Sequence, residues 1–275
     1  MKSRILTGIV GAVLIFVVLL FLPGIVLNFA MAAICAMAMY ELLVTTHHVT
    51  HRGVLAASIL FSACTPFFML GQSRLPAFLL LLGYVSVLVL FQILYHETLK
   101  VEHTAFAFCM SLIFPIAFSC LAYLRGFSER DGIFYVFLGL IMPWMCDMGA
   151  YFIGTFFGKH KLCPKISPKK TVEGLVGGIV ISVLSSVLAA WLYQIFWLNS
   201  HGGAVSLWQV ALLSLLCAPL SVMGDLFASI IKRQCQVKDF GHIMPGHGGI
   251  MDRFDSLLLV VPLFYIIVHY FPLVY

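Results

Sequence analysis

The sequence has little charge. Only 10% of its 275 residues are Asp, Glu, Lys or Arg, whereas 62% are hydrophobic. A soluble domain of this length carries roughly 25% charged residues. Too little polar surface remains to cover a water-soluble globule, so lipid must surround most of the chain. The composition therefore excludes a soluble enzyme, predicts an integral membrane protein, and leads us to expect no nucleic-acid partner.

Paired cysteines are also lacking. The eight cysteines are scattered, mostly within apolar stretches, and show neither a Cys-x-x-Cys pair nor a Cys/His metal spacing. This pattern favours buried, reduced thiols. The chain also shows no repeat of fixed period and no low-complexity tract. We expect one membrane-embedded domain over residues 1–275, with a helical scaffold in residues 1–140 and the catalytic segments in residues 141–256.

Long apolar runs predict an all-α, polytopic fold with about nine transmembrane helices. Runs of about 20 apolar residues are long enough to cross the hydrocarbon core as helices. Pro23-Gly24 separates the first two runs, because proline cannot continue the helical hydrogen bonds and glycine permits a tight turn. The predicted spans are Ile5–Leu22, Ile25–Val44, Val54–Leu70, Pro76–Tyr95, Thr104–Leu124, Ile133–Gly154, Leu175–Leu198, Leu207–Phe227 and Ser256–Tyr270.

Positive charge predicts the orientation of these spans. With the N-terminus in the cytoplasm, all of the 16 Lys and Arg residues except Arg74, Arg125 and Arg130 fall on the cytoplasmic side. Cytoplasmic loops of membrane proteins carry an excess of Lys and Arg. The sequence therefore predicts a cytoplasmic N-terminus and a C-terminus on the opposite side.

The first polar segment begins with Asp147, inside an apolar run. A carboxylate there is expensive in lipid, so we expect it to face the helix bundle. The lysines that follow can bind phosphates, although a loop that only sets the orientation or touches anionic lipid explains them equally well. These lysines are Lys159, Lys161, Lys165, Lys169 and Lys170.

Glycines in this segment resemble a phosphate-binding loop only in part. Gly154-x-x-x-Gly158-Lys159 is one residue short of that motif and lacks the following Ser or Thr, so we reject it. Gly154 and Gly158, with Gly174 and Gly178, are expected to let two helices approach closely.

The second polar segment runs from Gly224 to Asp255. Asp225, Ser229 and Lys232 are spaced i, i+4 and i+7, so on a helix they share one face. Residues 245–249 read Pro-Gly-His-Gly-Gly, a bend whose exposed amides can approach a phosphate. Carboxylates, cations and a glycine-rich bend together suit Mg²⁺ and a polyphosphate. The alternative is a salt-bridged loop that only joins two helices.

This segment resembles the signature of the phosphatidate cytidylyltransferases, or CDP-diacylglycerol synthases. The matching residues read Ser229-x-Ile-Lys-Arg-x4-Lys-Asp-x-Gly-x2-Met-Pro-Gly-His-Gly-Gly-Ile-x-Asp-Arg-Phe-Asp255. Met244 stands where the family usually has Leu, Ile or Phe. The segment Trp144…Asp147…Ala150-Tyr151…Gly154…Gly158…Ser167-Pro-Lys-Lys-Thr-x-Glu-Gly174 also resembles the region that precedes the signature in bacterial members. The N-terminal half is similar to the family only in hydropathy.

The resemblance implies the reaction CTP + phosphatidate → CDP-diacylglycerol + pyrophosphate, dependent on Mg²⁺, in phospholipid biosynthesis. It implies a multi-pass protein of the inner (plasma) membrane, with a site that faces the cytoplasm and a homodimeric assembly. The expected partners are CTP, phosphatidic acid and the lipid bilayer.

The resemblance also implies roles for single residues, because each occupies a position of the two motifs. Asp225 and Asp252 would hold the metal and act in catalysis. The other expected catalytic residues are Lys232, Lys238, Asp239 and His247. The expected substrate-binding residues are Asp147, Ser167, Lys169, Lys170, Ser229, Arg233, Gly248, Gly249 and Arg253.

The residues alone leave open the roles of one carboxylate and three histidines, and two alternative functions. Glu41 is a lone carboxylate near the end of an apolar run, where structural pairing and a contribution to the site are both possible. His47, His48 and His51 have metal-ligand spacing without a neighbouring carboxylate or cysteine, which favours a solvated loop. The alternative functions are a CTP-dependent polyprenol or phytol kinase and a membrane transporter, although the polar residues cluster in one half of the chain rather than in two.

Overall fold

The computed structural model describes residues 23–46, 49–68, 74–241 and 248–275. The predicted span Ile5–Leu22 and the side chains of His47, His48 and His247 lie outside these residues. The chain divides into two compact units. The first unit comprises residues 1–123 and 231–254, and the second comprises residues 124–230 and 255–275.

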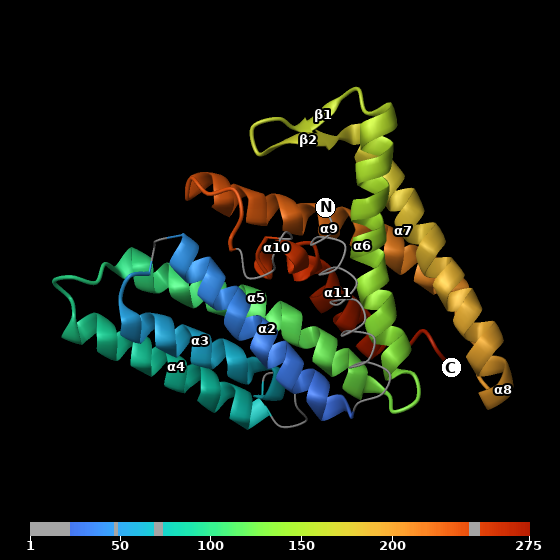
Figure 1. The fold of residues 1–275 in the computed structure, drawn as a ribbon. Helices are drawn as coiled ribbons and strands as arrows, with labels where there is room; N and C mark the ends of the chain where they lie inside the picture. Colours follow the sequence, from blue (N-terminus) through green and yellow to red (C-terminus); the bar gives the residue numbers. More distant parts are fainter. Residues whose placement is uncertain (1–22, 47–48, 69–73, 242–247) are drawn as a thin grey trace. The chain divides into compact units, whose positions relative to one another are not determined.

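The first unit is built from four apolar helices in its described part, and a short helix that follows the glycine-rich bend. In Figure 1, α2 (Gly24–Thr45), α3 (Arg52–Phe68) and α4 (Arg74–Leu94) pack as neighbours, in blue to blue-green. α5 (Val101–Phe127) continues into the second unit, and α10 (Met251–Phe254) is the short helix. The named elements in the described part of this unit are therefore all helices.

Hydroxyl groups join the helices of the first unit inside its core. The Ser58 hydroxyl of α3 lies 2.8 Å from the Tyr84 hydroxyl of α4, which in turn donates to Ser111 of α5 at 3.0 Å. Thr65 and Ser119 make a similar contact between α3 and α5 at 2.9 Å. Such interhelical hydrogen bonds hold helices together where lipid offers no hydrophobic driving force between them.

The second unit pairs two long helices around a hairpin. α6 (Gly132–Phe157) is followed by strands β1 (Lys161–Cys163) and β2 (Ser167–Thr171), and α7 (Val172–Tyr193) then returns beside α6 (Figure 1). The π-helical turn η1 (Gln194–Leu198) and α8 (Asn199–His201) end this arm. α9 (Leu207–Gln234) begins in this unit, and α11 (Leu257–Tyr270) completes it.

Glycines let α6 and α7 approach closely, as the sequence predicts. A Cβ added at Gly178 would lie 2.6 Å from the Cys146 carbonyl oxygen, and one at Gly174 would lie 2.7 Å from that of Ala150. A Cβ at Gly154 would lie 2.8 Å from the Thr171 hydroxyl. Larger residues at these positions would push the two backbones apart.

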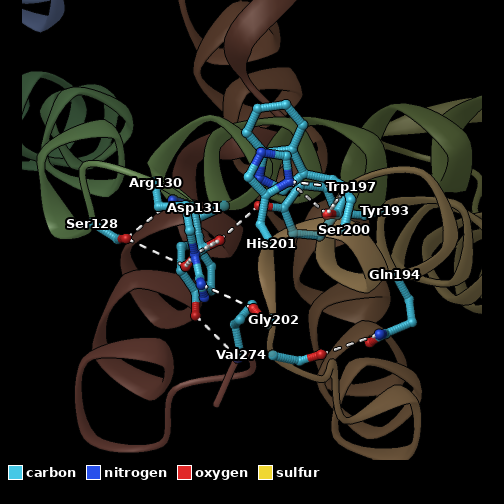
Figure 2. A network of polar contacts seen from close by, with 12 residues as sticks. Ser128, Arg130, Asp131, Tyr193, Gln194, Trp197, Ser200, His201, Gly202 and Val274 are labelled. Carbon is cyan, nitrogen blue, oxygen red and sulfur yellow. Dashed lines mark hydrogen bonds and ion pairs between the residues drawn. The ribbon is translucent and has the colours of Figure 1, made fainter.

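A polar network closes the other end of this helix pair, away from the hairpin (Figure 2). Asp131, just before α6, accepts a hydrogen bond from the Tyr193 hydroxyl at 2.7 Å and from Arg130 Nε at 3.0 Å. Arg130 also donates to the Gly202 carbonyl at 3.0 Å. The hydrogen bond that Arg130 donates to Asp131 raises the pKa of the Arg130 guanidinium. The network ties the start of α6 to the end of α7.

The helices make this chain a multi-pass membrane protein. Among the described residues, 6 helices are long and apolar enough to cross a membrane, and two shorter apolar helices are α3 and α11. Every predicted span that falls on described residues coincides with one of these helices, so the all-α class is confirmed. The count of nine spans and the orientation stay predictions.

Two local features differ from the sequence prediction. The lysines after Gly158 form a β-hairpin rather than an irregular loop. α9 continues to Gln234, beyond the predicted end at Phe227, so Ser229, Lys232 and Arg233 lie on the helix. The helix extends because residues 228–234 contain neither Gly nor Pro, and Gln, Lys and Arg favour helix.

Candidate active site

A cavity of about 660 Å³ opens in the second unit, where α6, the hairpin, α7 and α9 meet. Its wall is both cationic and acidic, since three lysines and two aspartates line it. We name it the lysine cavity. The polar residues that line it are Asp147, Tyr151, Thr155, Lys161, Ser167, Lys169, Lys170, Thr171 and Asp225.

The hairpin brings the lysines to this cavity. Lys161 of β1 pairs with Thr171 of β2, and the Ile166 amide donates to the Cys163 carbonyl at 3.1 Å to close the turn. Because Lys161 stands at one end of β1 and Lys169 and Lys170 stand in β2, a short ribbon places all three around one space.

The base of the hairpin is fastened to the first turn of α7. Glu173 accepts hydrogen bonds from the Lys159 amide at 3.0 Å and from the His160 amide and ring, the latter at 2.6 Å. Thr171 caps the helix by accepting from the Gly174 amide at 3.1 Å, which satisfies one of the free amides of the first turn. Hydrogen bonds therefore hold the base of the hairpin, just before β1 and at the end of β2, to the first turn of α7.

Lys170 and Asp225 form an ion pair at the cavity wall. Both side chains are mostly withdrawn from solvent, with exposed fractions of 22% and 26%. Asp147 of α6 lines the same cavity. The arrangement can bind phosphate groups through its lysines, and its two carboxylates can hold a hard cation.

Asp252 is the centre of a second cluster, in the first unit. Its Oδ1 lies 2.8 Å from the Lys232 ammonium, and its Oδ2 accepts from the amides of Phe240 at 2.9 Å and Gly249 at 3.2 Å. The Lys232 ammonium also lies 5.2 Å from the centre of the Phe240 ring, close enough for a cation–π contact. Asp252 thus binds the main chain at two places, Phe240 and Gly249.

Gly248 has a conformation that only glycine adopts easily. Its φ is +84°, in the left-handed region, and it lies directly before the amide that Asp252 binds. A side chain there would be strained whatever the available space. This explains one of the glycines in the motif by backbone geometry.

A model of the cytidylyltransferase family matches residues 2–271. The chain belongs to that family. It is similar to the phosphatidate cytidylyltransferase of Bacillus subtilis (strain 168), with 32% identity over 98% of each chain. The proteins of the same name from Staphylococcus haemolyticus (strain JCSC1435) and Staphylococcus aureus (strain COL) are 30% and 33% identical, over 96% of this chain and 97% of their own.

Family membership makes this chain a nucleotidyltransferase and decides against the transporter alternative. Two observations bear on how such an enzyme uses its residues. The second unit presents cations and carboxylates in one cavity, and the first presents an aspartate fixed by backbone amides.

The predicted site residues of this cytidylyltransferase fall into two groups. Asp147, Ser167, Lys169, Lys170 and Asp225 meet at the lysine cavity, and Lys232, Gly249 and Asp252 meet in the first unit. Of the others, Ser229 and Arg233 lie on α9 and Arg253 lies on α10, whereas Lys238, Asp239 and Gly248 lie between these two helices. Lys238, Arg233 and Arg253 are exposed, and Ser229, Asp239 and Gly248 are half-buried. His247 lies outside the described residues.

Asp225 and Asp252 belong to different units, so their sharing of a metal stays a prediction. Within the described ranges, no group of three or more His, Cys, Asp or Glu side chains could hold a metal. Mg²⁺ takes few protein carboxylates and completes its shell with water and substrate phosphates. The oxygen donors of Asp147 and Asp225 in one cavity fit such an ion.

Three residues had no assigned place in the site from sequence alone: Tyr151 stood only in the motif, Lys161 only among the lysines that can bind phosphates, and the role of Glu41 was open. Lys161 and Tyr151 line the lysine cavity, but only the hairpin and the turn of α6 show this. Glu41 is buried and accepts a hydrogen bond from the Met251 amide at 3.1 Å, next to Asp252. Its signal in the sequence was a lone carboxylate in an apolar helix.

Proposed function

We propose that this cytidylyltransferase transfers the cytidylyl group of CTP to phosphatidate and releases CDP-diacylglycerol and pyrophosphate. The observation that carries the proposal is the lysine cavity, in which Lys161, Lys169 and Lys170 stand beside Asp147 and Asp225. The cavity volume of about 660 Å³ falls within the usual range for small-molecule sites. The similar proteins of Bacillus subtilis and Staphylococcus haemolyticus are named phosphatidate cytidylyltransferases, which supports the choice of phosphatidate as the acceptor.

The chemistry needs charge more than it needs a base. The phosphate of phosphatidate is already an ionised nucleophile near neutral pH, so no side chain has to remove a proton. The difficulty lies in bringing two anions together and in stabilising negative charge on the α-phosphate and on the departing pyrophosphate. Lys161, Lys169 and Lys170 supply positive charge for this, and Ser167 supplies a hydroxyl donor.

We further propose that the enzyme uses Mg²⁺, held by Asp225 and Asp252. When bound, the ion supplies positive charge to the phosphates at the α-position and at the leaving group. Lys170 pairs with Asp225 and Lys232 pairs with Asp252 in the structure, and these contacts orient the two carboxylates. The remaining polar residues of the signature bind the substrate phosphates or stabilise the loop between α9 and α10. They are Arg233, Lys238, Asp239, His247 and Arg253.

The proposed location is the inner (plasma) membrane, with the site facing the cytoplasm. The hairpin end of the α6–α7 pair carries five lysines, whereas the Asp131 end carries Arg130. The positive-inside rule places the lysine-rich end in the cytoplasm, where CTP is available. A homodimer is part of the same proposal, and it stands on the resemblance to the family.

The proposal is tested with two labelled forms of CTP. Purified protein is incubated with phosphatidate, Mg²⁺ and CTP labelled at either the α- or the γ-phosphorus. The α-label should enter a chloroform-extractable lipid, and the γ-label should appear in pyrophosphate. Entry of the γ-label into lipid would instead show a kinase and reject the proposal.

A further inference from the structure

Glu41 occupies an unusual position for a carboxylate. It lies in α2, surrounded by apolar residues of that helix, and only 2% of its surface is exposed. Burying a carboxylate is costly unless hydrogen-bond donors compensate it. The Met251 amide donates to Glu41 Oε2 at 3.1 Å, and this amide belongs to the start of α10. Glu41 therefore contacts the signature segment through a main-chain amide, that of Met251.

Two glycines of that segment make room for the Glu41 side chain. A Cβ added at Gly241 would lie 2.2 Å from Oε1, 2.5 Å from Cδ and 2.8 Å from Cγ of Glu41. A Cβ added at Gly249 would lie 2.5 Å from Oε2. The carboxylate therefore fits a slot whose walls are glycine backbone, and any larger residue on either wall would displace it.

The same backbone segments hold Asp252. Phe240 and Gly249 donate their amides to Asp252 Oδ2, so the residues that flank or form the Glu41 slot also form the Asp252 site. Thr45, one helical turn after Glu41, donates to the Phe240 carbonyl. The main chain at Phe240 and at Gly249–Met251 thus contacts both α2 and Asp252, within the first unit.

We propose that Glu41 is a positioning residue, which fixes the main chain at Gly241 and at Gly249–Met251 so that Asp252 and its partner Lys232 keep their geometry. Glu41 acts through the main chain at Gly241, Gly249 and Met251 and does not touch the substrate. Its catalytic effect rests on the proposed function, whereas its effect on the order of the bend does not.

The first test replaces Glu41 in two steps. Glu41→Leu removes the acceptor for the Met251 amide, and Glu41→Gln keeps one oxygen acceptor. We expect Glu41→Leu to lower kcat by roughly 100-fold, as a misplaced catalytic group does, with little change in the KM for CTP. Glu41→Gln should recover a large part of kcat. Equal loss in both variants, or a rise in KM at unchanged kcat, would overturn the proposal.

A double-mutant cycle tests the contact itself. The three atoms nearest to a Cβ at Gly241 all belong to Glu41, so Gly241→Ala should disturb the site through that side chain. We expect Gly241→Ala and Glu41→Ala each to lower kcat, and the double variant to be no worse than Glu41→Ala alone. Losses that multiply would show that the two residues act independently and would contradict the proposal.

Amide hydrogen exchange supplies a readout that needs no activity. The amides of Gly249 and Met251 should exchange faster in Glu41→Leu than in the wild type, because the bend opens more often. The matched control is Ser58→Ala, which removes a buried hydrogen bond to Tyr84 in the same unit without touching the bend. Exchange at these amides that is unchanged in Glu41→Leu, or equally fast in the control, would reject the positioning role.

The two readouts separate the failure of this inference from the failure of the proposed function. If wild-type protein forms no labelled CDP-diacylglycerol, the proposed function fails, and the exchange data still decide the role of Glu41. If the wild type is active and Glu41→Leu has both a normal kcat and normal exchange, only the inference fails.

Discussion

The Lys232 ammonium lies 2.8 Å from Asp252 Oδ1, and the two side chains are only 13% and 7% exposed. Lys232 lies in the last turn of α9, whereas Asp252 lies in α10. The ion pair therefore joins the two ends of the signature segment. Breaking a buried pair leaves one charge uncompensated, which is far more harmful than losing an exposed pair.

Asp252→Asn should lower turnover by roughly 100- to 1,000-fold, because the variant keeps the side-chain shape but loses the charge that pairs with Lys232 and that would hold the proposed Mg²⁺. The measurement is the rate of CDP-diacylglycerol formation at several Mg²⁺ concentrations. Lys238→Ala is the control, since Lys238 is exposed and should retain measurable turnover at raised substrate. Near-normal activity of Asp252→Asn with unchanged Mg²⁺ dependence would reject the metal assignment.

Asp225→Asn should show a similar loss, because it removes a carboxylate from the lysine cavity and leaves Lys170 without its partner. The expected decrease in kcat is again on the order of 100-fold or more. Membrane insertion should be unaffected, which a fluorescent fusion and size-exclusion chromatography can verify. An Asn variant that retains wild-type turnover would show that Asp225 lies outside the reaction.

Lys170→Ala should raise the KM for CTP by roughly 10- to 100-fold, the size expected for losing one charge-assisted hydrogen bond. Lys165→Ala provides a matched comparison, because Lys165 belongs to the same basic segment but lies in the exposed hairpin turn and does not line the cavity. Its kinetics should remain close to those of the wild type. Equal effects of the two substitutions would indicate that the lysines act through their total charge, for example by attracting anionic lipid, and not through a specific position in the cavity.

The two ends of the α6–α7 pair should face opposite sides of the membrane. In a background without native cysteines, Lys165→Cys and a cysteine beside Asp239 should react only with reagent that reaches the cytoplasm. Ser200→Cys should react from outside. Labelling of the hairpin position from outside would overturn the predicted orientation.

Asp131→Ala should destabilise the protein without changing its chemistry. The buried carboxylate accepts hydrogen bonds from the Tyr193 hydroxyl and from Arg130 (Figure 2), and its loss removes this charged acceptor, at about 1.5–3 kcal/mol for a hydrogen bond to a charged group. The melting temperature in detergent should fall by several degrees. The kcat of the folded fraction should stay normal, since α6 separates Asp131 from the lysine cavity. A selective loss of kcat would contradict this separation.

The membrane fold was accessible from sequence because one physical constraint governs it. A helix in lipid must satisfy its own backbone groups and present about 20 apolar residues, so hydropathy alone locates α2 to α7, α9 and α11 within a few residues, except for the end of α9 at Gln234. The close approach of α6 and α7 was also predictable, because Gly174 and Gly178 have no side chains to keep the two backbones apart. The resemblance over residues 229–255 identified the family from residue order alone.

Side-chain partners required the tertiary structure. Nothing in the sequence shows that Lys170 pairs with Asp225 or that Lys232 pairs with Asp252, because these pairs join elements far apart in the chain. The β-hairpin was hidden because a short, lysine-rich ribbon has no strong period of its own. Glu41 is the clearest case. Its sequence position shows only a costly carboxylate, and its partner amide lies 210 residues away, brought to it by the packing of α2 against α10.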